Sequence, residues 1–113
     1  KLLQDDAKTW LDKIHRLSIG EIYLNSIDRD GTGQGLLLDI LELIPENISL
    51  PIILSGGVGF EDHIFEGLRD PRVNAVSTAH LFNFIGDGLK DAREELIKKN
   101  FNLAQWDNIK CLD

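Results

Sequence analysis

Apolar and polar positions follow one another along this chain in two rhythms, one typical of helices and one typical of strands. Over residues 7–17 the apolar positions recur at helical spacing, which predicts an amphipathic helix that Asp5 or Asp6 can cap and Gly20 can end. Residues 21–27 form a short run that favours a strand, and the run stops at the turn-rich stretch 28–33. The chain is therefore expected to begin with a helix, a strand and a loop.

The same alternation repeats twice more downstream. Apolar residues at 37, 40, 41 and 44 restore the helical period before Pro45, and residues 51–55 form a second strand-like run that leads into Gly56 and Gly57. A third helix is expected over 60–68, a third strand over 73–78 and a last helix from 89 to near 100. The predicted order is one helix followed by three strand–helix units.

The spacing of these units indicates an α/β fold with a parallel sheet. The strand centres lie about 25–30 residues apart, as they do where a crossover helix follows each parallel strand. With 113 residues and no linker or repeat, we expect a single domain, 1–113. Three strands alone leave two open edges, so we expect missing residues, self-association through those edges, or both. Because the first residue is Lys1 and not methionine, we also expect the segment to begin partway through a longer protein.

Charge and composition exclude several classes of function. The formal net charge is -7, from 12 basic and 19 acidic residues, which opposes broad binding to nucleic acid or to an anionic membrane surface. An anionic ligand would have to be held locally. No apolar run reaches the roughly 18–20 residues that cross a bilayer, so we expect no membrane insertion. The one cysteine, Cys111, cannot form an internal disulfide, which favours a reducing, cytoplasmic location.

Three motifs follow the three predicted strands. They are S-I-D-R-D-G-T at 26–32, P-I-I-L-S-G-G at 51–57 and A-H-L-F-N-F at 79–84. In this order the motifs resemble the loops after strands six, seven and eight in the cyclase subunit of imidazole glycerol phosphate synthase. The resemblance covers about residues 6–100 and implies part of a (β/α)₈ TIM barrel of the ribulose-phosphate-binding type, with the N-terminal part absent. A whole barrel of this kind takes about 250 residues.

The resemblance also implies an activity. It is a lyase-type cyclase that closes an imidazole ring in histidine biosynthesis, acting on a phosphorylated sugar-type substrate with ammonia from a glutamine amidotransferase subunit. The two principal catalytic aspartates of that family lie on strands one and five, which these residues do not contain. We therefore expect the segment alone to be inactive and to supply a phosphate-binding site.

The expected phosphate site lies in the loops after the second and third strands. Gly56 and Gly57 lack Cβ atoms, so their amides can approach an anion closely and lead into the next helix. The alternative is a tight turn without a ligand, since glycine after a strand often serves only that purpose. The resemblance adds further residues around the phosphate: Gly31, Ser55, Ala79 and His80.

Asp30 is the candidate catalytic residue of this segment. With Asp28 it lies at the mouth of the first strand, where a carboxylate can serve acid/base chemistry or bind substrate hydroxyls. The alternative is an ordinary turn, because aspartate before glycine is common there. The resemblance favours Asp30 as the residue that contacts substrate.

Other features leave alternatives open. Asn25, Gln34 and His80 depart from the residues usual in the resembled family, so the substrate can differ. One alternative is a related barrel that amidates sugars for surface polysaccharide, and another is a non-catalytic half-barrel that binds phosphorylated ligands. His15 and His63 lie on predicted helices without a second ligand at metal spacing. We expect both to be surface residues, and we expect neither a metal nor a cofactor.

Overall fold

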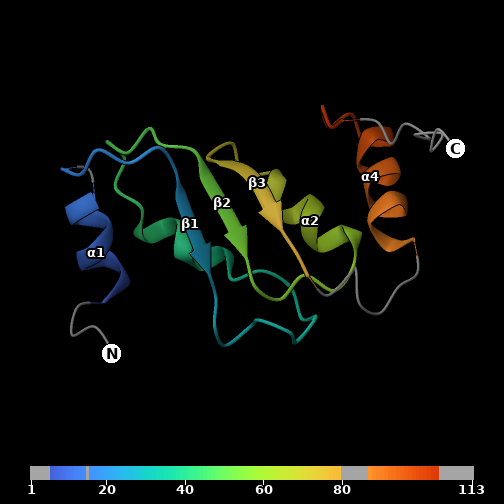
Figure 1. Ribbon diagram of the computed structural model, residues 1–113, viewed down its shortest axis with the longest axis horizontal. Helices are drawn as coiled ribbons and strands as arrows, with labels where there is room; N and C mark the ends of the chain where they lie inside the picture. The colour runs from blue at the N-terminus through green and yellow to red at the C-terminus, as the bar shows by residue number, and fades with distance from the viewer. Residues whose placement is uncertain (1–5, 15, 80–86, 105–113) are drawn as a thin grey trace, which may run out of the picture.

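A computed structural model describes residues 6–14, 16–79 and 87–104 of the 113-residue chain. Three strands lie side by side, and helical segments follow or flank them (Figure 1). In chain order the elements are α1 (Ala7–Ile14), β1 (Ile22–Asn25), the 3₁₀ helix η1 (Leu38–Leu43), β2 (Ile52–Ser55), α2 (Glu61–Leu68), β3 (Val73–Ser77) and α4 (Gly88–Lys98). The predicted order of helices and strands is confirmed.

The three strands form one parallel sheet in the order β1-β2-β3. Strands β1 and β2 pair in continuous register from Ile22 with Ile52 to Asn25 with Ser55. The register between β2 and β3 shifts once, because Ile52 pairs with Val73 but Ile53 pairs with Ala75. The α/β class with parallel strands, expected from the spacing of the strands, is confirmed.

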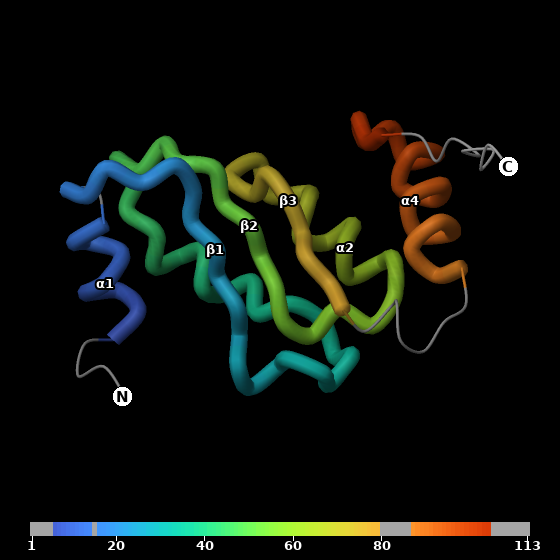
Figure 2. The backbone as a smooth tube through the Cα atoms, viewed as in Figure 1, coloured from blue at the N-terminus to red at the C-terminus, as the bar shows by residue number. Residues whose placement is uncertain are grey.

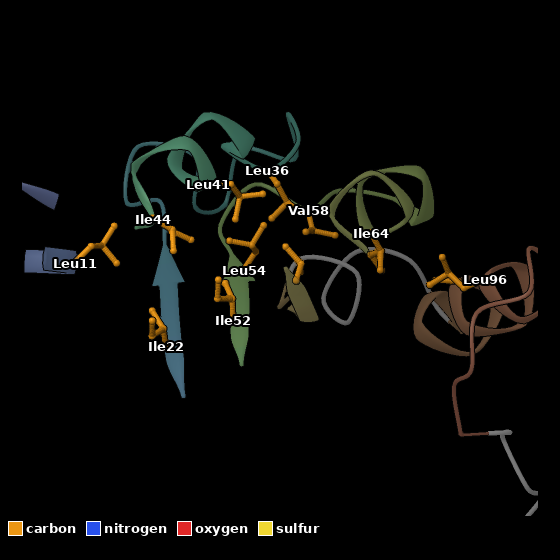
Figure 3. Close-up of a cluster of buried hydrophobic side chains, with 12 residues drawn as sticks. Leu11, Ile22, Leu36, Leu41, Ile44, Ile52, Leu54, Val58, Ile64 and Leu96 are labelled. Carbon is orange, nitrogen blue, oxygen red and sulfur yellow. The ribbon is translucent and has the colours of Figure 1, made fainter. Parts of the chain in front are cut away.

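The two faces of the sheet differ in their side chains and in their cover. In the view of Figure 1, η1 and α2 lie behind the sheet, and no described helix covers the face toward the viewer. Buried apolar side chains, from α1 at one end to α4 at the other, make up the core (Figure 3). The core residues are Leu11, Ile22, Leu36, Leu41, Ile44, Ile52, Leu54, Val58, Ile64, Val73, Ala92 and Leu96. The side chains that alternate with them on the strands are mostly polar or aromatic.

The segment expected as a second helix is a short 3₁₀ helix. It spans the six residues of η1, and the amide of Ile44 donates to the carbonyl of Leu41 at 3.2 Å. A 3₁₀ helix has three residues per turn, so Leu38, Leu41 and Ile44 lie on one stripe, and the last two are buried. The apolar residues thus repeat every three positions as well as at α-helical spacing, and Pro45 stops any extension.

The chain is extended along the direction in which the strands follow one another. Its extents are 51 × 30 × 27 Å, with α1 and α4 at opposite ends of the long axis (Figure 2). The radius of gyration is 16.0 Å. A compact chain of this length has about 13 Å. Strands β1 and β3 each pair with one strand only among the described residues, so the sheet has two open edges. No helix in the described ranges is long and apolar enough to span a bilayer.

Candidate functional site

A polar cleft lies at the carboxyl ends of the three strands. Because the strands are parallel, the loops that follow them meet at one edge of the sheet, where ligands of α/β proteins commonly bind. The cleft measures about 220 Å³. Its lining residues come from all three strand–loop junctions: Tyr23, Asn25, Asp30, Gly31, Ser55, Gly56, Gly57, Val58, Ser77, Thr78 and Ala79.

Two glycines of the second loop lie against the backbone of the first loop. Gly56 and Gly57 have φ angles of 92° and 98°, in the region that favours glycine. A Cβ atom on Gly56 would lie 2.5 Å from the carbonyl oxygen of Ser26, and one on Gly57 would lie 2.1 Å from that of Gly35. The two loops are therefore packed so closely that side chains are excluded at both positions.

The first loop, residues 26–35, holds itself in one conformation. The carbonyl of Ser26 accepts hydrogen bonds from the amides of Arg29 and Asp30, at 3.2 and 2.9 Å. Nη1 of Arg29 donates to the carbonyl oxygens of Gln34 and Gly35, at 3.3 and 3.4 Å. Arg29 is thus engaged within its own loop, and its guanidinium is not among the groups that line the cleft.

A short hydrogen bond ties the two loops together. The amide of Gly35 donates to the carbonyl of Gly57 at 2.7 Å. This bond fixes the peptide that joins Gly57 to Val58, since the carbonyl of Gly57 and the amide of Val58 belong to the same peptide unit. The loops act as one unit, because the hydrogen bond and the close backbone contact occur at the same pair of residues.

Three amides in the second loop are open donors. Gly56, Gly57 and Val58 are buried residues, and their N–H groups donate no hydrogen bond to the residues that the structure describes. Buried amides in proteins are almost always paired with protein groups or water. Since all three residues line the cleft, these donors are available to a ligand with oxygen acceptors.

Hydroxyl groups form the floor of the cleft. The Tyr23 hydroxyl donates to Oγ of Ser77 at 3.4 Å, and Ser77 pairs with Ser55 across the sheet. Hydrogen bonds with Ser55 and then with Ser77 lower the pKa of the Tyr23 phenol from its usual value of 10.0. Sequence reasoning missed Tyr23 and Ser77, although strand alternation was a usable signal. Tyr23 lies between the inward-facing Ile22 and Leu24, so it must point to the opposite face.

The structure brings six of the seven predicted site residues to this cleft. Asp30 and Gly31 come from the first loop, Ser55, Gly56 and Gly57 from the second junction, and Ala79 from the third. The seventh, His80, lies outside the described residues. Asp28, which sequence reasoning weighed beside Asp30, does not line the cleft and is exposed.

The cleft is poor in charge. Asp30 is its one acidic lining residue, and no lysine or arginine belongs to the described lining. Among the described residues, no group of three or more histidine, cysteine or acidic side chains lies close enough together to hold a metal. Any anion bound here would be held by amides and hydroxyls, and Asp30 would repel a negative charge placed beside it.

A second, larger hollow is apolar and lies beside β1. It measures about 550 Å³, between α1, β1 and η1. Trp10 and Leu11 line it from α1, Ile22 and Leu24 from β1, and Ile40 from η1. This apolar groove runs along the open edge of the sheet, on the side where a further strand would lie.

Comparisons with known proteins agree on one family. The family model described as "Histidine biosynthesis protein" matches residues 3–85. A protein named as a candidate imidazole glycerol phosphate synthase subunit hisF2, from Parasynechococcus marenigrum, is 49% identical over 76% of this chain and 32% of its own length. The imidazole glycerol phosphate synthase subunit HisF of Lachnoclostridium phytofermentans is 39% identical over 90% of this chain and 40% of its own.

A third relative extends the pattern. The HisF subunit of Chlorobaculum tepidum is 35% identical over 87% of this chain and 39% of its own length. The chain therefore spans between about a third and two fifths of the length of these curated relatives.

Proposed function

The chain belongs to the histidine biosynthesis protein family, and on this premise we propose that it is part of an imidazole glycerol phosphate synthase cyclase and provides the grip on a substrate phosphate. Two relatives carry the name of the HisF subunit of that synthase. The observation that carries the proposal is the set of open amides at Gly56, Gly57 and Val58 in the polar cleft. In the whole enzyme, the substrate is a phosphorylated sugar-type molecule.

The chemistry of the cleft supports a bound phosphate. A phosphate oxygen accepts hydrogen bonds from N–H groups, and each bond to a charged partner contributes about 1.5–3 kcal/mol. Open amides can supply such bonds without a lysine, as they do in other glycine-rich phosphate loops. The N-terminus of α2 adds little to the binding of a phosphate, because the negative charges of Glu61 and Asp62 already lie in its first turn. The hydroxyls of Ser55 and Ser77 offer further donors on the floor.

Asp30 has a different role in this proposal. A carboxylate beside a phosphate repels it. We therefore assign Asp30 to bind a substrate hydroxyl, or the reacting part of the substrate, that lies near the phosphate. Its amide is fixed by the Ser26 carbonyl at 2.9 Å, which holds the residue at the mouth of the cleft. The remaining catalytic groups, including the aspartates that the family places on strands one and five, belong to parts of the barrel outside this chain.

The three strands are assigned to positions six, seven and eight of a (β/α)₈ barrel, with residues 1–113 as one unit of it. The polar face of the sheet, with Tyr23, Asn25, Ser55 and Ser77, then faces the barrel axis, and the helices form the outer layer. The apolar groove beside β1 is the space for strand five. Size-exclusion chromatography tests this assignment, since the isolated segment should self-associate through its open edges; a stable monomer would count against it.

In the whole enzyme, ammonia would come from a glutamine amidotransferase subunit. The substitution Asp30→Asn in the full-length protein, assayed for ammonia-dependent turnover, tests the functional assignment. We expect turnover to fall by about tenfold or more, since a charge-assisted hydrogen bond to substrate is lost. Asp28→Asn is the matched control, because Asp28 is exposed on the same loop but does not line the cleft. Equal turnover for both variants would remove Asp30 from the mechanism.

One observation favours a second candidate, a related cyclase-like barrel that amidates a sugar for surface polysaccharide. Asn25, which departs from the threonine usual in the resembled family, lines the cleft directly. The neighbouring floor residue Tyr23 adds bulk and a second polar group. Ammonia-dependent turnover of a full-length protein on each of the two substrate types separates the candidates, since only one should be consumed.

A further inference from the structure

His63 lies in the first turn of α2 and interacts with the loop that precedes this helix. Its Nδ1 accepts a hydrogen bond from the amide of Gly59 at 3.1 Å. The imidazole ring also stacks on Phe60, with 3.8 Å between ring centroids and an interplanar angle of 36°. Sequence reasoning expected His63 on the surface, but the side chain is half-buried. Because Nδ1 accepts, this nitrogen carries no proton in the structure.

His63 also lies beside the first loop. A Cβ atom on Gly35 would lie 3.4 Å from Cδ2 and 3.5 Å from Nε2 of the imidazole ring. Gly35 is the residue whose amide donates to the carbonyl of Gly57 at 2.7 Å. The imidazole ring therefore lies beside Gly35, and its Nδ1 binds the amide of Gly59, the residue two positions after Gly57.

The backbone around His63 is closely packed. Gly59 is buried, and a Cβ atom on it would lie 2.6 Å from the carbonyl oxygen of Gly33. The residue at the N-cap of α2, Phe60, makes no side-chain hydrogen bond to the helix. His63 binds the amide of Gly59, one residue before this N-cap, so the bond resembles the second half of a capping box shifted by one position. The open amides of Gly56, Gly57 and Val58 come immediately before Gly59 in the chain.

We propose that His63 is a positioning residue of the anion site, because its Nδ1 anchors the amide of Gly59 and so holds the open amides of this loop ready for phosphate. The inference rests on the proposed phosphate-binding function. His63 itself does not line the cleft, so it acts through the loop and not by contact with the ligand. A residue that only started the helix would affect stability and leave phosphate affinity unchanged.

Two substitutions at position 63 separate the role of the Nδ1 acceptor from the role of the imidazole ring. His63→Asn places an amide oxygen near the position of Nδ1 and keeps an acceptor for Gly59, whereas His63→Phe keeps the stacked ring and removes the acceptor. Inorganic phosphate is titrated into the full chain and each variant, followed by ¹H–¹⁵N NMR. We expect His63→Phe to weaken phosphate binding by about fivefold or more, since a buried amide loses its partner. His63→Asn should bind within about twofold of the parent chain.

The amide of Gly59, observed without phosphate, provides an independent readout. Its hydrogen exchange should accelerate in His63→Phe and stay slow in His63→Asn. If the parent chain binds no phosphate, the proposed function fails, and the inference fails with it. If the parent chain and His63→Phe bind phosphate equally, the site stands and only the role of His63 is overturned. Unchanged Gly59 exchange in a folded His63→Phe variant would also overturn that role.

Discussion

Replacing Gly57 with alanine should separate the two loops of the cleft. The new Cβ atom would lie 2.1 Å from the carbonyl oxygen of Gly35, and a backbone atom cannot rotate away as a side chain can. The φ angle of 98° adds strain of about 1–2 kcal/mol for a residue with a Cβ atom. Loss of the hydrogen bond between Gly35 and Gly57 adds about 0.5–1.5 kcal/mol. We therefore expect Gly57→Ala to lower the free energy of unfolding by about 2–3 kcal/mol.

Two other glycines provide matched controls for this experiment. Gly31 has a φ angle of 74° but nothing within 4 Å of a Cβ atom, so Gly31→Ala should cost about 1 kcal/mol from strain alone. Gly20 has neither a positive φ angle nor a close neighbour, and Gly20→Ala should be near neutral. Urea unfolding followed by circular dichroism gives all three values. If Gly57→Ala were no less stable than Gly31→Ala, the close packing of the loops would be refuted.

Two further predictions concern the floor of the cleft and the loop before β3, at the opposite end of the strands. Tyr23→Phe removes the hydroxyl that donates to Ser77, so the floor of the cleft loses one hydrogen bond. In a phosphate titration, this variant should bind phosphate about two- to fivefold more weakly than the parent chain. Unchanged affinity would remove Tyr23 from the site. Hydrogen bonds from the side chain and then the backbone amide of Arg72 lower the pKa of Asp70 to about 2, against 3.8 unperturbed. Because the pKa of Asp70 is lower in the folded chain than in the unfolded chain, its pairing with Arg72 stabilises the fold above about pH 4. This stabilisation is lost as the pH falls toward 2. Asp70→Asn should therefore reduce stability at pH 7 by up to about 1 kcal/mol and flatten the acid limb of a thermal unfolding profile, whereas an acid limb identical to that of the parent would contradict the pairing.

The strands and most helices could be predicted because their signals are local. Residues 51–55 and 73–78 are β-prone runs followed by small or polar residues, and β2 and β3 lie within those bounds. The 3₁₀ geometry of η1 was missed, because apolar residues at 38, 41 and 44 fit a period of three as well as they fit an α-helix.

Glycine is needed at positions 56 and 57 for two physical reasons, and only one of them could be predicted from the sequence. Sequence reasoning assigned Gly56 and Gly57 to close approach of an anion, and the open amides are compatible with that prediction. The close contacts with Ser26 and Gly35 could not be foreseen, because they depend on how a loop about 25 residues away folds back across the sheet. His63 was missed for the same reason, since its contact with Gly35 is not local.

A phosphate titration of the ¹⁵N-labelled chain is the sharpest test of phosphate binding in the polar cleft. We predict that the amide resonances of Gly56, Gly57 and Val58 shift together along one saturable binding curve, since these are the open donors of the cleft. The resonances of amides at the amino ends of the strands, such as that of Arg72, should stay in place. Absence of saturable shifts at the three loop amides, in a chain that is folded, would contradict the assignment of this cleft to phosphate.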